Sequence, residues 1–287
     1  MSIPYTLKHG LKVARWRARR LAVSARYGSE RLKATPSVLG NAMPKSGSHL
    51  IIQVLQGLPR LGPFVNPGFP PVNRSEENRK LGREAILNNI QRMLPGDIAY
   101  GYVGAEAEPV RVLTQPGRAM VFVYRDPRDM IVSHVFYATQ MHAGHGMHRY
   151  YNDTLKSMEE RLNAAIEGVE EPGSQLSPVR IKYEGYIGWL DQPAVLCLRF
   201  EDLILDRQNA LDRLLSYVQQ RGFTPTMPRS QEIEILGQAI APKKSGTFRK
   251  GQPGNWREHF TAANKDFFKE QTGDLLYRLG YETSADW

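Results

Sequence analysis

The stretch Pro44-Lys45-Ser46-Gly47-Ser48-His49 decides how this chain is interpreted. It follows a short apolar run at Val38-Leu39 and precedes a helix-like run from Leu50 to Leu55. A strand, a Gly/Ser loop and a helix in that order direct backbone N–H groups toward an anion such as phosphate. The lysine adds a cation, and the two serines add hydroxyl donors. We therefore predict a phosphate-binding loop at residues 44–49, with a helix directly after it.

The order of residues in this loop differs from that of nucleoside-triphosphate enzymes. Their pattern, G-x-x-x-x-G-K-[ST], places Lys directly after Gly, whereas here Lys45 comes two residues before Gly47. A P-loop kinase or nucleotide hydrolase therefore remains only as an alternative, one that predicts ATP binding and a requirement for Mg²⁺.

Three further segments continue the pattern of strands and polar turns. Residues 121–129 read Val-Phe-Val-Tyr-Arg-Asp-Pro-Arg-Asp, which indicates a buried strand and a Pro-marked turn, and a helix begins near Met130. Residues 195–203, Val-Leu-Cys-Leu-Arg-Phe-Glu-Asp-Leu, indicate another strand, and residues 247–256, Thr-Phe-Arg-Lys-Gly-Gln-Pro-Gly-Asn-Trp, form a basic loop. Strands separated by helices are typical of an α/β fold whose loops gather at the carboxyl ends of the strands.

In this order, the four segments resemble the sulfotransferases that use 3′-phosphoadenosine 5′-phosphosulfate (PAPS), from about Ser37 to Tyr281. The resemblance implies an α/β fold in a single domain, with a central parallel sheet flanked by helices and a P-loop-like nucleotide-binding core. That domain is expected over residues 36–287, after a basic, helical N-terminal arm at residues 1–35. The implied reaction moves a sulfuryl group from PAPS to a hydroxyl or amine and releases adenosine 3′,5′-bisphosphate (PAP), without a metal.

The resemblance also implies a role for each site residue. The residues expected to hold the 5′ end of PAPS are Lys45, Ser46, Gly47, Ser48 and His49, and Lys45 is the expected electrostatic catalyst. The residues expected to hold the 3′-phosphate are Arg125, Ser133, Arg249, Lys250 and Gly251. Phe200 and Phe248 are aromatic candidates for contact with the adenine. Arg128 either binds the 3′-phosphate together with Arg125 or pairs with Asp126 or Asp129.

The general base is the one role for which this chain departs from the family. The family places a His after Gly, about 23 residues before Tyr-Arg-Asp-Pro, and here Tyr102 follows Gly101 at that place. Tyr102 is a candidate to position the acceptor or relay its proton, although an unperturbed Tyr with a pKa of about 10 is a poor base. The other candidate bases are Glu106, His134 and the cluster His142, His145 and His148.

Two further hypotheses follow from the Tyr at this position. An acceptor that is already nucleophilic needs no strong base. A non-catalytic PAP-binding or scaffold protein needs none either, and it is the alternative function from a different class.

Positive charge is concentrated at the N-terminus. Of the net charge of +9, residues 1–33 carry +8, from nine Lys and Arg against Glu30. Apolar residues at helical intervals in this arm predict a basic amphipathic helix, which either packs on the body of the protein or touches an anionic membrane or polyanion. No nucleic-acid reader motif accompanies the charge, so nucleic acid is not an expected partner.

Cysteine usage and hydropathy indicate where the protein works. The one cysteine, Cys197, excludes an internal disulfide and a thiolate zinc site, and it fits a reducing, cytoplasmic location. No apolar run approaches the ~20 residues of a membrane span, and the basic N-terminus lacks the apolar region of a secretory signal.

Two loops are candidates for the acceptor site. Residues 61–71 are rich in Pro, Gly and Phe and are typical of an acceptor-lining wall, whereas the His-rich residues 142–148 suit a mobile lid. The spacing of those histidines matches no zinc frame. We expect a small-molecule acceptor, with a glycan or lipid headgroup as alternatives. Residues 257–266 keep only Thr261 of the family's dimerisation segment, which leaves dimerisation open.

Overall fold

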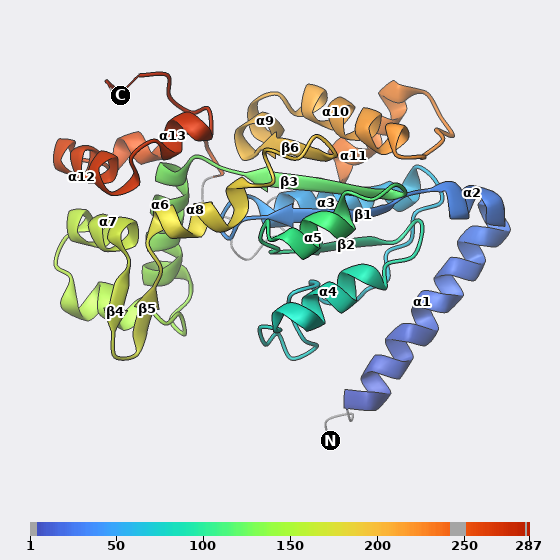
Figure 1. Ribbon diagram of the computed structural model, residues 1–287, viewed down its shortest axis with the longest axis horizontal. Coiled ribbons are helices and arrows are strands. Elements are labelled where there is room, and N and C mark those ends of the chain that lie inside the picture. The colour runs from blue at the N-terminus through green and yellow to red at the C-terminus, as the bar shows by residue number, and fades with distance from the viewer. Residues whose placement is uncertain (1–4, 242–250, 285) are drawn as a thin grey trace. The chain divides into compact units, whose positions relative to one another are not determined.

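The computed structural model of this chain describes residues 5–241, 251–284 and 286–287 (Figure 1). Four strands form a parallel sheet in the order β2-β1-β3-β6, with β1 at Ser37–Ala42, β2 at Ile98–Gly101, β3 at Arg118–Tyr124 and β6 at Val195–Arg199. Every residue of β1 is buried. Such continuous burial is expected of a parallel strand covered on both faces. The predicted α/β fold with a central parallel sheet is confirmed.

The sheet belongs to the first of two compact units, which comprises Met1–Tyr124 and Gly188–Lys244. Its central strand pairs on both sides, because Val38 lies opposite Ile98 on one neighbour and Ala119 on the other. The other elements of this unit are α1 (Tyr5–Tyr27), α2 (Ser29–Ala34), α3 (Ser48–Gly57), a 3₁₀ turn (Leu58–Arg60), α4 (Arg83–Gln91), α5 (Ala107–Leu113), α9 (Phe200–Leu205), α10 (Arg207–Gln220) and α11 (Arg229–Ala239).

One face of the sheet is covered by α3, α10 and α11. Alternate residues of β3, such as Val121 and Val123, share a buried apolar cluster with Val54 of α3, Leu214 of α10 and Leu236 of α11. Because side chains alternate across a strand, this cluster lies on one face, and it holds α3 firmly behind the loop that follows β1. The position of that loop is therefore set by the core.

One side of the N-terminal helix α1 contacts the rest of the first unit. Lys12 pairs with Glu76, and Trp16 Nε1 and Arg20 Nη1 donate to Asp97 Oδ1 at 3.0 and 2.8 Å. The opposite side of the helix faces solvent, where Leu21 is 72% exposed. The described helices include none with the length and apolar character that crossing a bilayer requires.

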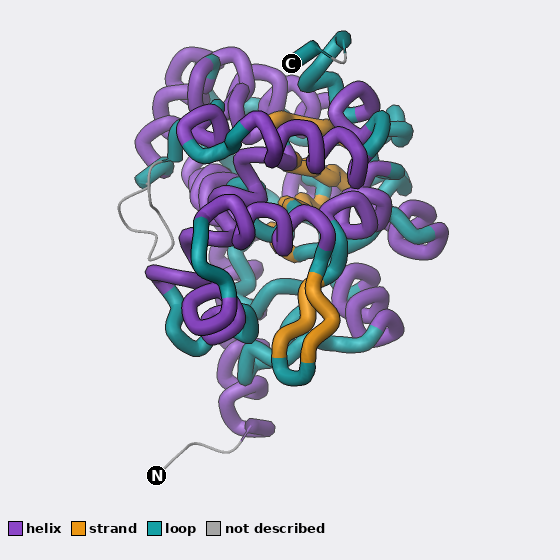
Figure 2. The backbone as a smooth tube through the Cα atoms, turned by 90° about the vertical axis from the view of Figure 1, so that its left-hand side faces the viewer, coloured by secondary structure: helices purple, strands orange, loops and turns teal. Residues whose placement is uncertain are grey.

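The second unit comprises Arg125–Ile187 and Ser245–Trp287. Figure 2 shows its hairpin, formed by β4 (Val169–Glu171) and β5 (Ser174–Leu176), which pair antiparallel. The helical elements of the unit are α6 (Pro127–Phe136), π-helical turns at Tyr137–Met141 and Tyr150–Thr154, α7 (Met158–Glu167), α8 (Val179–Ile187), a 3₁₀ turn at Asn255–Glu258, α12 (Ala262–Thr272) and α13 (Leu275–Arg278).

Candidate functional site

The loop between β1 and α3 has a strained backbone. Lys45 has φ of 66°, and Gly47, the N-cap residue of α3, has φ of 92° with no hydrogen bond from a capping side chain. A non-Gly residue at positive φ costs about 1–3 kcal/mol and occurs mostly at functional sites. An uncapped helix N-terminus also leaves its first N–H groups available to an anion.

Gly47 is needed for space as well as for conformation. A Cβ at this position would lie 2.5 Å from Cδ2 of Phe200, the first residue of α9. The Phe200 ring is buried and packs against the Gly47 backbone. Phe200 therefore supports the loop by packing against Gly47, and this role does not depend on contact with an adenine.

Ser46 supplies a buried hydroxyl inside this loop. The residue is fully buried, and its Oγ has no hydrogen-bond partner among the described residues. An unsatisfied buried hydroxyl costs about 1–3 kcal/mol, so its presence requires a reason. A phosphate oxygen would accept from this hydroxyl, which makes the loop a fitting cradle for a phosphate group.

His49, in the first turn of α3, is exposed and lies near Lys45. Partial loss of water around the ring lowers the pKa of the imidazole, and the charge of Lys45 lowers it further. The ring is therefore neutral at pH 7, so Lys45 is the residue that brings charge to this loop.

Tyr102 lies directly beside this loop. Its hydroxyl donates to Ser48 Oγ at 2.9 Å. The backbone on either side of it is fixed by buried amides, because its N–H donates to Asn73 Oδ1 and the N–H of Val103 donates to Asn41 Oδ1. Residues 101–103 are thus held beside the predicted phosphate loop, where Tyr102 supplies a phenol.

Glu106, another candidate base, is on the surface of the first unit. It is the N-cap residue of α5, its side chain is half-exposed, and it forms an ion pair with Arg83 at 3.5 Å. These contacts give it an ordinary surface role.

In the second unit, Arg125 and the start of α6 are tied to the segment after Gly251. Arg125 is buried and its Nη2 lies 3.4 Å from Asp129 Oδ2 and 3.5 Å from the carbonyl of Gln252. Asp129 accepts the N–H groups of Gly254 and Trp256, each at 2.8 Å. Burial raises the pKa of this carboxyl, and Arg125 partly offsets the increase. Asp129 therefore anchors residues 254–256, a role that its place next to Arg128 in the sequence does not indicate.

Arg128 is a structural residue. Its guanidinium is buried and pairs with Asp126 at 2.7 Å and with Glu282 at 2.6 Å. The cation also stacks on the rings of Trp256 and Trp287, 4.0 and 4.4 Å from their centroids. Of the two roles left open for it, the structure assigns the internal ion pair.

The remaining second-unit candidates lie on or near α6. Ser133 is half-buried on α6, and His134 follows it, with its ring edge-on to His145 and Tyr151. Gly251 has φ of 62°. Phe248, Arg249 and Lys250 lie outside the described residues.

The His-rich loop forms internal contacts. His145 Nδ1 accepts from the N–H of Met147, and His148 Nδ1 contacts the carbonyl of Ala138 at 2.8 Å. Across the described part of the chain, no three His, Cys, Asp or Glu side chains are grouped as metal ligands. Thr261, the residue shared with the dimerisation segment, caps α12 and donates to Glu159 at 2.7 Å.

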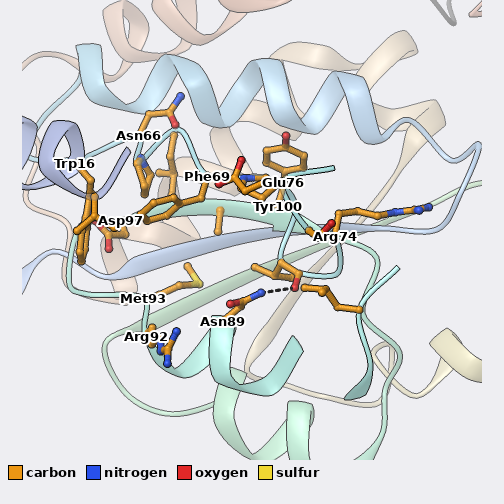
Figure 3. Close-up of a pocket in the computed structure, with 18 of the residues that line it drawn as sticks. Trp16, Asn66, Phe69, Arg74, Glu76, Asn89, Arg92, Met93, Asp97 and Tyr100 are labelled. Atoms are coloured by element: carbon orange, nitrogen blue, oxygen red, sulfur yellow. Dashed lines mark hydrogen bonds between the residues drawn. The ribbon is translucent and has the colours of Figure 1, made fainter. Parts of the chain in front are cut away.

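A cavity of about 510 Å³ lies within the first unit (Figure 3). Residues 61–71, considered as an acceptor wall, contribute Asn66, Pro67, Phe69 and Pro70 to it. The sequence did not indicate that α1 and Tyr100 also line it. The one available signal was the spacing of His9, Val13 and Trp16, which places them on one face of a helix.

Comparison with known proteins identifies the family. A model of the sulfotransferase domain matches residues 36–280. The chain is 23% identical over 164 residues to a 3-alpha-hydroxysteroid sulfotransferase of Cavia porcellus, an alignment that covers 52% of this chain and spans about half, 53%, of that protein.

Two solved structures share the fold. One is a mouse sulfotransferase complexed with PAP, with a TM-score of 0.59 and 13% identity over 95% of this chain and 92% of that one. The other is retinol dehydratase in complex with androsterone and the inactive cofactor PAP, with a TM-score of 0.55 and 12% identity over 90% and 85% of the two chains. With a family match over most of its length, this chain belongs to the sulfotransferase domain family.

Proposed function

We propose that this protein is a PAPS-dependent sulfotransferase that sulfates a hydroxyl or amine of a small molecule and releases PAP. The observation that carries the proposal is the buried hydroxyl of Ser46, which has no partner among the described residues and sits in a strained loop at the start of α3. Membership of the sulfotransferase domain family supports the 5′ end of the donor as the ligand of that loop.

Bound PAPS would supply the sulfuryl group. Its 5′-phosphate would be the leaving group when the bond between sulfur and the phosphate oxygen breaks. The chain's own task is to position the reactants and stabilise the charge that develops on that phosphate. Lys45 brings the cation, Ser46 and Ser48 donate hydroxyls, and the N-terminus of α3 presents N–H groups. The hydroxyl of Tyr102 contacts Ser48 Oγ and so helps to hold that serine in place at the start of α3.

The 3′-phosphate is assigned to the second unit. Arg125 suits bidentate contact with a phosphate, and Ser133, Gly251, Arg249 and Lys250 complete the proposed set. The contacts of Asp129 with Gly254 and Trp256 support this role, since they hold the segment that follows Gly251.

Proton removal from the acceptor is proposed not to depend on Tyr102 as a base. Its hydroxyl already donates to Ser48, which suits a positioning role. Glu106 is a weaker candidate because Arg83 pairs with it. Two proposals therefore remain: His134 takes up the acceptor proton, or the acceptor is nucleophilic enough to need no strong base.

The relatives support a small-molecule acceptor, because one is named for a hydroxysteroid and another was solved with androsterone. We also propose a cytoplasmic location. The one cysteine of the chain, Cys197, supports this proposal because it allows no internal disulfide.

The test is turnover of PAPS with a panel of alcohols, phenols and amines, followed by mass spectrometry of the products. Wild-type protein should sulfate at least one compound, and Lys45→Ala should lower the rate by about 10²–10³, the usual cost of losing one charge-stabilising donor. Tight binding of PAP without sulfation of any acceptor would favour the non-catalytic alternative instead.

A further inference from the structure

The cavity of the first unit lies along the helix that follows the phosphosulfate loop, here meaning residues 44–49. Ile52 and Gln56 of α3 line it, and they follow Ser48 at intervals of four residues. Residues four apart lie on one face of a helix. The face of α3 that begins at Ser48 therefore continues directly into the cavity wall.

The strand β2 gives an independent link to the same place. Tyr100 of β2 lines the cavity, and Tyr102, two residues later, donates to Ser48. Burial raises the pKa of the Tyr100 phenol, and the nearby Tyr102 phenol raises it further. One end of the cavity thus lies two residues along the chain from Tyr102, the residue that contacts Ser48 of the phosphosulfate loop.

The helix α1 forms the opposite wall. His9, Val13 and Trp16 line the cavity from one face of this helix. The ring of Phe69 lies against it, with centroids 5.7 Å from Trp16 and 6.2 Å from His9. In Figure 3, Trp16 and Asp97 lie side by side at one end of the group, and Tyr100 lies nearer its middle. A ligand in the cavity is therefore flanked by aromatic rings.

The carboxylates that line the cavity are already paired with groups of the protein. Asp97 accepts from Trp16 Nε1, Arg20 Nη1 and the N–H of Leu94, at 3.0, 2.8 and 2.9 Å. Glu76 is bound by Lys12. Their charge is therefore not available to a cationic ligand.

The two arginines of the lining lie toward solvent. Arg74 donates to the carbonyl of Asn78 at 3.1 Å, and its side chain extends away from the other labelled residues in Figure 3. Arg92 is exposed. The rest of the wall combines aromatic and aliphatic side chains with neutral polar ones such as Gln56, Asn66 and Asn89, and an unpaired charge is costly to bury there.

We propose that this cavity is the acceptor site, that α1 is its specificity-determining wall, and that the acceptor is an uncharged, largely apolar alcohol or phenol. The inference rests on the proposed function. In the step it implies, the acceptor oxygen forms a bond to sulfur, the bond from sulfur to the leaving phosphate oxygen breaks, and the acceptor proton leaves to solvent or a base. A volume of about 510 Å³ is within the range of small-molecule sites.

The first arm of the test compares two matched substitutions on α1. Val13→Phe adds a ring inside the cavity without removing a polar contact, and Leu21→Phe makes a similar change on the exposed face, where Leu21 lines nothing in the cavity. With 2-naphthol as acceptor, Val13→Phe should raise KM at least tenfold. Leu21→Phe should leave KM unchanged, and both variants should bind PAP within twofold of wild type.

The second arm varies only the charge of the acceptor. It compares 4-propylphenol with tyramine, which adds a cation, and with 3-(4-hydroxyphenyl)propionate, which adds an anion. The neutral phenol should have a kcat/KM at least about 100-fold higher than either charged analogue. Similar values for the three phenols, or an unchanged KM in Val13→Phe, would overturn the inference while PAP binding still upheld the proposed function. Failure of wild-type protein to bind PAP would overturn both.

Discussion

The turns that lead into α3 and α6 both connect a parallel strand to a helix, but they satisfy their polar groups differently. At α6, Asp126 caps the helix by accepting the N–H of Arg128 at 2.9 Å, and Pro127 occupies the first helical position. At α3, the cap is Gly47 at positive φ, no capping side chain bonds to the helix, and the Ser46 hydroxyl has no partner among the described residues.

The difference separates a structural turn from a binding turn. A helix N-terminus that is capped by its own side chain needs no ligand, whereas one with strained backbone and an unsatisfied hydroxyl gains stability when an anion binds. Replacing the capping residues Asp126 to Arg128 should therefore cost mainly stability, and removing the Ser46 hydroxyl should cost mainly binding.

The largest effect is expected at Arg128. Arg128→Met leaves Asp126 and Glu282 without their shared cation in a buried place, and removing one partner of a buried ion pair costs about 3–5 kcal/mol. Urea unfolding should show a loss of this size. Arg111→Met is the matched control, because Arg111 pairs with Glu108 on the surface, and it should unfold like wild type. Equal stability of the two variants would contradict the structural role of Arg128.

The next effect is expected at Gly47. Gly47→Ala places a methyl group 2.5 Å from the Phe200 ring and forces a positive φ on alanine, which should cost about 2–3 kcal/mol and weaken PAP binding. Gly117→Ala has the same kind of φ, 75°, with open space around the added carbon. It should cost only about 1 kcal/mol and leave PAP binding intact. If both variants bind PAP equally, the close fit at Gly47 does not matter.

A smaller effect is expected at Tyr102. Tyr102→Phe removes the donor to Ser48 but leaves the ring in place, so we expect a loss of turnover of about tenfold or less, equivalent to one neutral hydrogen bond. The measurement is kcat with PAPS and the best acceptor. A loss of more than 10³ would identify Tyr102 as the proton acceptor and would refute the positioning role.

The smallest effect concerns pH and His49. Burial and Lys45 lower the pKa of this imidazole below 6.5 in the folded chain. As pH decreases below 6.5, His49 is protonated more readily in the unfolded chain than in the folded chain. The free energy of unfolding therefore falls as pH decreases below 6.5. His49→Gln should lessen this fall when unfolding free energies are compared at pH 7.5 and 5.5. An identical decrease in both proteins would show that His49 is not its source.

The sheet and the strand, loop and helix around residues 44–49 could be predicted from local sequence, because an apolar run such as Val121–Val123 and a Gly/Ser loop are each recognisable within a few residues. Contacts that join distant segments could not. The hydrogen bond from Tyr102 to Ser48 depends on the pairing of β1 with β2, and the amide contacts of Asp129 depend on residues more than a hundred positions later. The spacing of Val13 and Trp16 indicated an apolar face on α1, but not the cavity that it lines.

The most direct test of the account is a thermal-shift titration of wild type and Ser46→Ala with PAP, beside ATP and Mg²⁺. PAP at about 100 times its Kd should add about 2.7 kcal/mol to wild-type stability. Without ligand, Ser46→Ala should be at least as stable as wild type, because an unsatisfied buried hydroxyl is removed, but its shift with PAP should be smaller. No shift of wild type with PAP, or an equal shift in Ser46→Ala, would contradict the claim that this loop binds the phosphate of the donor.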